Sequence, residues 1–263
     1  MKKYIFSIVI ALHAITSHAG SFEQLPTRDG VRLPFLYEKP EQPKAIVVLF
    51  QGGGGSIGVS GSKDRGWIQR DKAFLSGGAT RFSKNGLVVA IVDAPSDRGD
   101  LNGGFRNSNE HNTDIKKLVE FLKSDNPNLS VWLIGTSNGS LTAAGAAIAL
   151  NDAVISGIVL TSTVTEEHSW SMGQKFVHPV YRADLTKVTV PVLIVHHKND
   201  RCKHSPYQPI DALSKAFPNS KRVELISVDG GSDISDSCNG GFHQYLGQEQ
   251  EVTDLISKWI LTN

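Results

Sequence analysis

The stretch VWLIGTSNGSLTAAGAAIAL at residues 131–150 decides the fold of this chain. A short apolar run at 131–134 leads into the pentapeptide GTSNG at 135–139, and an alanine-rich run follows directly. The apolar run predicts a strand buried on both faces, and the alanine-rich run predicts a helix from about Ser140 to Leu150. Glycines on both sides of the serine suit a turn that is too tight for larger side chains.

Ser137 lies at the centre of this predicted turn. In a strand–turn–helix setting, the pattern G-x-S-x-G lifts its serine above the carboxyl edge of a sheet. The dipole of the following helix can then stabilise negative charge beside that serine. Ser137 is therefore the candidate nucleophile. A glycine-rich turn without chemistry, or a phosphate-binding loop, is the alternative interpretation.

Other apolar runs flank this unit and alternate with segments that can form helices. This alternation predicts the α/β class, with a doubly wound, mostly parallel sheet, helices on both faces and an opening β-hairpin. The insertion at 163–189 is too short for a separate lid, so only a minimal cap is expected. The predicted strands cover residues 22–25, 31–37, 45–50, 87–92, 131–134, 155–160, 191–195 and 222–228. The predicted helices cover residues 70–85, 113–123, 140–150, 206–217 and 248–261.

A serine needs a base before it can act as a nucleophile. On this kind of sheet the chain order is Ser, then Asp or Glu, then His, with the histidine after the last strand. His243 is the only histidine after the last predicted strand, so it is the candidate base. Asp200 closely follows the strand at 191–195 and is the candidate acid, which would hold the histidine in one tautomer. Asp233 and Asp236 are the alternatives, although they follow a different strand.

Two other features complete the sequence interpretation of the site. Four glycines at 52–55 follow a predicted strand, and the N–H groups of Gly53, Gly54 and Asn138 are the candidate oxyanion donors. A merely flexible loop is the alternative for the glycines. The histidines that end the strand at 191–195 are assigned a packing or loop role; they are His196 and His197.

The N-terminus has the features of a secretory signal peptide. Lys2 and Lys3 precede a mostly apolar run of 13 residues at 4–16, and Ser17 and Ala19 put small residues at the two positions that a signal peptidase reads before a cut after Ala19. That run is too short to span a bilayer, which argues against a membrane anchor. We therefore expect residues 1–19 to be a signal peptide, residues 20–263 to form a single domain, and the protein to be secreted or periplasmic.

The chain has two cysteines, Cys202 and Cys238. An oxidising compartment permits a disulfide between them, whereas two separate buried thiols are the alternative. Such a bridge would tie the loop of Asp200 to the loop of His243. Our hypothesis is that it fixes the spacing of the acid and the base.

Composition limits the possible partners. The formal net charge of +1 gives no electrostatic reason to expect nucleic acid as a partner. Arg98 and Arg106 could bind an anionic group, but solvated loop charges are the commoner explanation. Four aromatic residues either line an acyl site or belong to the core: Trp67, Phe105, Trp170 and Phe176.

The motif GTSNG at 135–139, together with the glycine run, Asp200 and His243, carries a family resemblance. The chain resembles the α/β-hydrolase superfamily along nearly all its mature length. The resemblance is to esterases and lipases, and it implies an eight-stranded type of sheet, acyl-enzyme chemistry and no metal or organic cofactor. Gln51 stands where many members carry histidine before the glycines. The expected activity is hydrolysis of a small-molecule ester, with a peptidase or amidase, or a non-catalytic binding protein, as alternatives.

Overall fold

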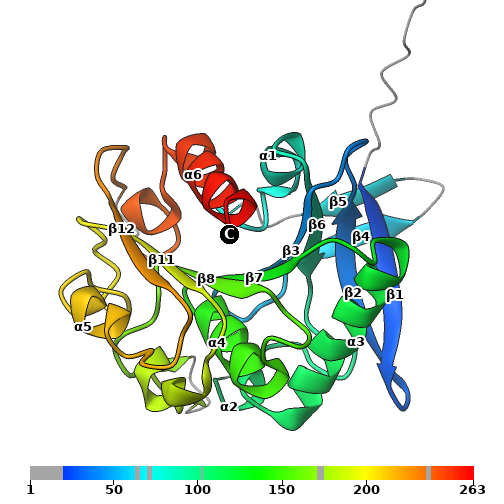
Figure 1. The fold of residues 1–263 in the computed structure, drawn as a ribbon, viewed down its shortest axis with the longest axis horizontal. Helices are drawn as coiled ribbons and strands as arrows, with labels where there is room; N and C mark the ends of the chain where they lie inside the picture. The colour runs from blue at the N-terminus through cyan, green and yellow to red at the C-terminus, as the bar shows by residue number, and fades with distance from the viewer. Residues whose placement is uncertain (1–19, 63–65, 70–72, 102, 171–174, 235–237) are drawn as a thin grey trace, which may run out of the picture.

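The structure is a computed structural model of the chain (Figure 1). It describes residues 20–62, 66–69, 73–101, 103–170, 175–234 and 238–263. The predicted signal peptide at 1–19 and Asp236 lie outside these residues. In the described part of the chain, no helix is long and apolar enough to cross a membrane.

An eight-stranded sheet forms the centre of the molecule, in the order β1-β2-β6-β3-β7-β8-β11-β12. In this spatial order, each strand from β6 across to β12 is parallel to its neighbour in that part of the sheet. Strand β2 pairs antiparallel with both β1 and β6. The predicted α/β class, the mostly parallel sheet and the opening hairpin are confirmed. The strands are β1 Ser21–Arg28, β2 Val31–Glu38, β3 Ala45–Phe50, β6 Leu87–Val92, β7 Val131–Thr136, β8 Gly157–Thr161, β11 Val192–His197 and β12 Val223–Val228.

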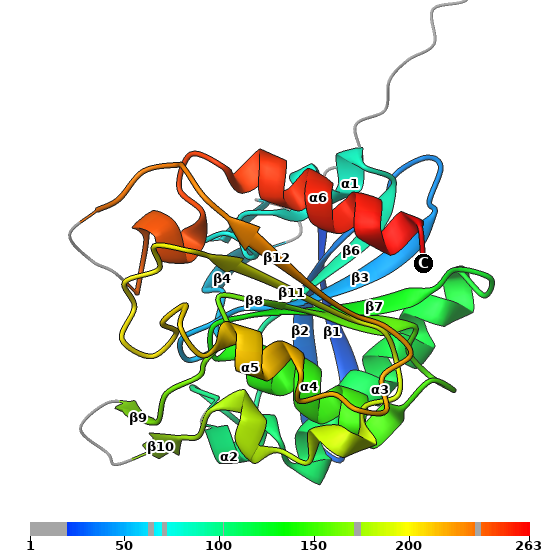
Figure 2. The same cartoon turned by 60° about the vertical axis from the view of Figure 1, so that its left-hand side comes forward.

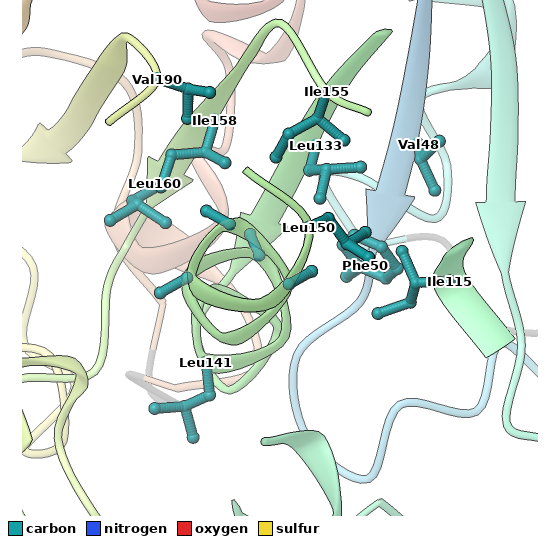
Figure 3. Close-up of a cluster of buried hydrophobic side chains, with 14 of the residues drawn as sticks. Val48, Phe50, Ile115, Leu133, Leu141, Leu150, Ile155, Ile158, Leu160 and Val190 are labelled. Carbon is teal, nitrogen blue, oxygen red and sulfur yellow. The ribbon is translucent and has the colours of Figure 1, made fainter. Parts of the chain in front are cut away.

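Helices cover both faces of this sheet (Figure 1). Side chains alternate along a strand, so successive residues of the same strand enter different cores. Val48, Leu133 and Ile158, from three adjacent strands, face α4 in one core (Figure 3). Their sequence neighbours Val47 and Trp132 pack under α1 and α6 in the other core. The helices are α1 Ala79–Lys84, α2 Gly103–Arg106, α3 Asn109–Asp125, α4 Gly139–Leu150, α5 Ile210–Ser214 and α6 Glu249–Leu261.

Two helix predictions were wrong in their N-terminal bounds. Of the helix predicted over 70–85, residues 70–72 lie outside the described part, and among the others only α1 is helical. The described residues before α1 form turns in which Gly78 N–H donates to Leu75 O. A Cβ on Gly78 would lie 2.9 Å from Phe74 O, so this turn requires glycine. α3 begins before Thr113, because the Ser108 hydroxyl caps its first turn by accepting from the His111 N–H.

Other segments also differ from expectation. The helix predicted over 206–217 shortens to α5, and α2 forms in a segment for which no helix was predicted. The insertion at 163–189 carries two short strands that pair with each other beside α2 (Figure 2). A second small hairpin that the sequence interpretation missed follows the glycine run. These strands are β4 Val59–Ser62, β5 Gly66–Gln69, β9 His168–Trp170 and β10 Lys175–Val177.

Candidate active site

Ser137 occupies the turn between β7 and α4 with a φ of 51°. This left-handed conformation costs a non-glycine residue about 1–2 kcal/mol, so the surroundings must impose it. A Cβ on Gly135 would lie 2.2 Å from Gly139 O, and a Cβ on Gly139 would lie 2.0 Å from Phe50 O. The backbone is therefore packed too closely on both sides of the serine for any other residue. The Ser137 N–H donates to Thr161 O at 3.0 Å.

The glycine run after β3 packs directly on this turn. A Cβ on Gly52 would lie 2.9 Å from Ser137 Cβ and 3.5 Å from Ser137 Oγ. The next residues form a turn in which Gly55 N–H donates to Gly52 O at 3.0 Å. Among the described residues, the N–H groups of Gly53 and Asn138 have no hydrogen-bond acceptor. Both are therefore available to an oxygen bound beside Ser137.

Asp200 and His243 form a buried pair, with Asp200 Oδ2 2.8 Å from His243 Nδ1. Asp200 lies in the loop after β11, and His243 lies in a one-turn 3-10 helix, Gly241–Gln244, just before α6. Burial raises the pKa of Asp200, but hydrogen bonds from His196 and His243 outweigh it and lower that pKa to about 2. The carboxylate is therefore ionised and can only accept, so His243 carries its proton on Nδ1 and leaves Nε2 free to act as a base.

The end of β8 connects the two halves of the site. Thr161 O accepts from the Ser137 N–H, and the next residue, Ser162, donates its hydroxyl to His243 O at 2.7 Å. The buried Tyr245 hydroxyl donates to Val195 O at 2.8 Å and accepts from the Ser162 N–H at 3.2 Å. These bonds hold the nucleophile turn and the histidine helix at one end of the sheet.

A cavity of about 270 Å³ lies at this junction. Its walls bring Ser137 and the glycine run together with residues next to the candidate base in the sequence. Among the described residues that line it, no side chain is a large apolar one. The lining residues are Gln51, Gly52, Gly53, Gly54, Ser56, Ala73, Ser137, Cys238, Asn239 and Gln244.

The predicted disulfide between Cys202 and Cys238 is present. It joins the loop of Asp200 to the segment before His243, as the spacing predicted. The Cys202 N–H also donates to Asp200 Oδ1 at 2.9 Å. The alternative acid Asp233 instead forms an ion pair of 2.6 Å with Arg201.

His196 is a residue whose place the sequence interpretation missed. It is fully buried, and its Nε2 lies 2.8 Å from Ser205 O and 3.5 Å from Asp200 Oδ2. Both partners are acceptors, so Nε2 carries the proton and His196 supports the carboxylate in addition to packing. His197 keeps the packing role predicted for it, because its ring stacks on Phe242 with the centroids 4.4 Å apart.

The predicted solvated charge on Arg106 was wrong, because its side chain is completely buried. Arg98 lies over the ring of Phe105 at 4.3 Å, and Phe105 is a buried residue that does not line the cavity. The other three aromatic candidates have side chains outside the described part of the structure; they are Trp67, Trp170 and Phe176. Within the described residues, no group of three or more His, Cys, Asp or Glu side chains could hold a metal ion.

Comparison with known proteins gives one family match and many structural ones. A family model described as serine aminopeptidase, S33, matches residues 74–183. No curated protein matches the sequence.

The matching solved structures cover most of the chain at low sequence identity. Est1E from Butyrivibrio proteoclasticus has a TM-score of 0.62 at 18% identity, covering 93% of this chain and 98% of its own. Dienelactone hydrolase from Anabaena variabilis has a TM-score of 0.62 at 16% identity, with coverage of 93% and 99%. A cold-adapted esterase from an Arctic intertidal metagenomic library has a TM-score of 0.60 at 17% identity, with coverage of 90% and 92%.

The solved structures show that this chain has the fold of the α/β-hydrolases, and residues 74–183 resemble the family of the matching model. The fold that the resemblance implied is therefore confirmed.

Proposed function

We propose that the protein hydrolyses small carboxylic esters through an acyl-enzyme intermediate. Ser137 is the nucleophile, His243 the general base and Asp200 the acid that orients the base. The N–H groups of Asn138 and of Gly53 or Gly54 hold the oxyanion. The observation that carries the proposal is a chain of hydrogen bonds: Ser137 is held to Thr161, the next residue Ser162 is held to His243, and His243 is held to Asp200.

The chemistry follows from these positions. His243 Nε2 takes the hydroxyl proton as Ser137 Oγ attacks the ester carbonyl carbon, and the carbonyl oxygen becomes an oxyanion. Collapse of this intermediate breaks the bond to the alcohol, which leaves with the proton from His243. Water then repeats the sequence on the acyl-enzyme and releases the carboxylic acid. Asp200 keeps its charge throughout and stabilises the imidazolium.

The cavity favours short esters over long-chain lipids. Its volume is about 270 Å³, and amide, hydroxyl and glycine groups make up most of its walls. An extended alkyl chain would find few apolar partners there. The described part of the insertion at 163–189 forms a short ribbon and two one-turn 3-10 helices, which agrees with an open site.

A peptidase or amidase is the second candidate, because the matching family model is described as a serine aminopeptidase. The same nucleophile, base and acid can cleave an amide. Hydrolysis of an aminoacyl p-nitroanilide at a rate above that of short esters would favour this candidate.

We further propose that residues 1–19 are removed on export and that residues 20–263 act as a single domain outside the cytoplasm. The positively charged start and the apolar run support export, and the disulfide suits an oxidising compartment. Mass spectrometry of the exported protein should find Gly20 as its first residue. An intact N-terminus would contradict the proposal.

Hydrolysis of short-chain p-nitrophenyl esters tests the main proposal. We expect the wild-type protein to be active and Ser137→Ala to lose activity, while Ser124→Ala, an exposed serine on α3, keeps the wild-type rate. Equal rates for wild type and Ser137→Ala would remove Ser137 from the mechanism. Inactivity of the wild type on both esters and anilides would favour a binding protein.

A further inference from the structure

Arg106 is a buried cation behind the glycine run, with 1% of its surface exposed. Its Nη2 donates to Gly53 O at 3.0 Å and to Gln51 O at 3.4 Å. The Nε donates to Leu101 O at 3.2 Å, and the Nη1 donates to the Thr142 hydroxyl at 3.1 Å. All four acceptors are neutral, and no carboxylate forms an ion pair with this guanidinium in the described residues.

A buried charge without an ion-pair partner is costly, so this arrangement calls for an explanation. Burial lowers the pKa of Arg106 to about 10, and the nearby Asp100 carboxylate opposes this change. Arg106 is therefore still a cation at neutral pH. Its hydrogen bonds bring this charge into direct contact with the carbonyl oxygens of Gln51 and Gly53.

The peptide geometry shows what these hydrogen bonds do. In a planar trans peptide the C=O and N–H point in opposite directions. The carbonyl of Gln51 shares its peptide unit with the N–H of Gly52, and the carbonyl of Gly53 shares its unit with the N–H of Gly54. By holding both carbonyls, Arg106 directs both of these N–H groups away from itself.

The peptide unit between these two is held as well. Its carbonyl, Gly52 O, accepts from the Gly55 N–H, so the orientation of the Gly53 N–H is set. The Asn138 side chain adds a second donor to Gly53 O at 3.1 Å. Three consecutive peptide units of a glycine run, which would otherwise sample many conformations, are thus held in one orientation.

We propose that Arg106 is a positioning residue for the oxyanion hole: it fixes the glycine run that carries the Gly53 and Gly54 N–H groups, and it polarises the peptide unit of the Gly54 N–H, so that this group donates more strongly to the oxyanion. Donors that are already oriented cost no reorganisation when negative charge develops. A hydrogen bond that a carbonyl accepts strengthens the bond that the N–H of the same unit donates. This inference rests on the proposed function of Ser137.

A trifluoromethyl ketone tests the proposal without ester turnover. Ser137 Oγ adds to the ketone carbon, the serine proton moves to His243 Nε2, and the ketone oxygen becomes an oxyanion that fluorine NMR detects. The affinity of folded protein for the ketone does not depend on the fraction that folds. We compare wild type with Arg106→Lys, Arg106→Met and Arg98→Met. The last is the matched control, because Arg98 is exposed and, among the described residues, contacts Asp97 and Phe105 and not the glycine run.

We expect Arg106→Met to lower both the adduct affinity and kcat by roughly 10- to 1000-fold, with a much smaller change in KM. Arg106→Lys should recover part of the loss because it keeps the charge, and Arg98→Met should match wild type. Unchanged affinity in both Arg106 variants would overturn the proposal, as would an equal loss in Arg98→Met.

Thr142→Val covers the case in which neither Arg106 variant folds. It removes one acceptor of the guanidinium while the glycine run keeps its sequence. A weaker adduct supports the proposal, and an unchanged adduct in this variant overturns it. Wild-type protein that forms the adduct without cleaving esters refutes the proposed ester hydrolysis alone, whereas wild-type protein that forms no adduct overturns both.

Discussion

The two halves of the candidate site are held in place by different means. Around Ser137, the backbone of neighbouring elements packs so closely that Gly135 and Gly139 have no room for a Cβ. Around Asp200 and His243, side chains from distant parts of the sequence meet through hydrogen bonds and a disulfide. The nucleophile half thus depends on glycines that lack a Cβ, whereas the acid–base half depends on side chains that bind one another.

This difference indicates how each half can be damaged. Adding a methyl group should disrupt the nucleophile half, because there is no space for it. Removing or neutralising a side chain should disrupt the acid–base half, because each group there depends on a partner. The variants below test this contrast, starting with the largest expected effect.

Asp200→Asn should lower kcat by roughly 10⁴-fold, because an amide can hold the His243 ring in the wrong tautomer. Stopped-flow or steady-state hydrolysis of a short ester measures the effect. The matched control is Asp233→Asn, since Asp233 pairs with Arg201 and should retain activity. The reverse pattern would assign the acid role to Asp233.

Gly139→Ala should destabilise the fold by about 3 kcal/mol or more, because its new methyl carbon would lie 2.0 Å from Phe50 O. Urea denaturation followed by circular dichroism measures the free energy of unfolding. Gly99→Ala is the control, because a Cβ there meets nothing within 4 Å. Similar unfolding free energies for the two variants would show that close packing does not hold the nucleophile half in place.

The same contrast explains what the sequence could predict. The strands of the sheet and the turn at Ser137 depend on local patterns, and these fold predictions are confirmed. The positions of Asp200 and His243 could be predicted only from chain order, and their catalytic roles stay predictions. The contact between His196 and Asp200 depends on how the loop after β11 folds back on its strand, which no local pattern encodes.

The burial of Arg106 is a clearer example of a feature that the sequence could not predict. An arginine in a polar segment is usually exposed, so its burial could not be expected. The acceptors that surround it come from three segments far apart in the sequence. The predicted helix over 70–85 failed for a related reason, because the turn at Gly78 is set by close contact with Phe74 O and not by apolar spacing.

Replacing both Cys202 and Cys238 by serine should lower the free energy of unfolding by about 2–4 kcal/mol, because the bridge closes a long loop. We also expect a lower kcat, since the bridge joins the acid loop to the base loop. Thermal melting and ester hydrolysis measure the two effects. Wild-type protein treated with a reductant should show the same losses. If neither the melting temperature nor kcat changes, the bridge has no part in holding the Asp200–His243 pair.

Lowering the pH should reduce the contribution of Asp200 to the free energy of unfolding by about 2 kcal/mol, the smallest of these effects. The pKa of Asp200 in the folded protein is about 2, below its ordinary value of 3.8. Above the ordinary value both states are ionised and the full contribution is present. As the pH falls through this interval the unfolded chain binds the proton first, so stability is lost until the folded carboxylate is protonated.

The difference in unfolding free energy between wild type and Asp200→Asn isolates this contribution from those of other carboxylates. It should shrink as the pH falls from about 5 to about 2, because only the wild type loses a charged hydrogen-bond acceptor for His243 and His196. Urea titrations at several pH values measure it. A difference that stays constant over this range would mean that the buried carboxylate does not depend on its two histidine donors, and that the acid–base half is not held by paired side chains.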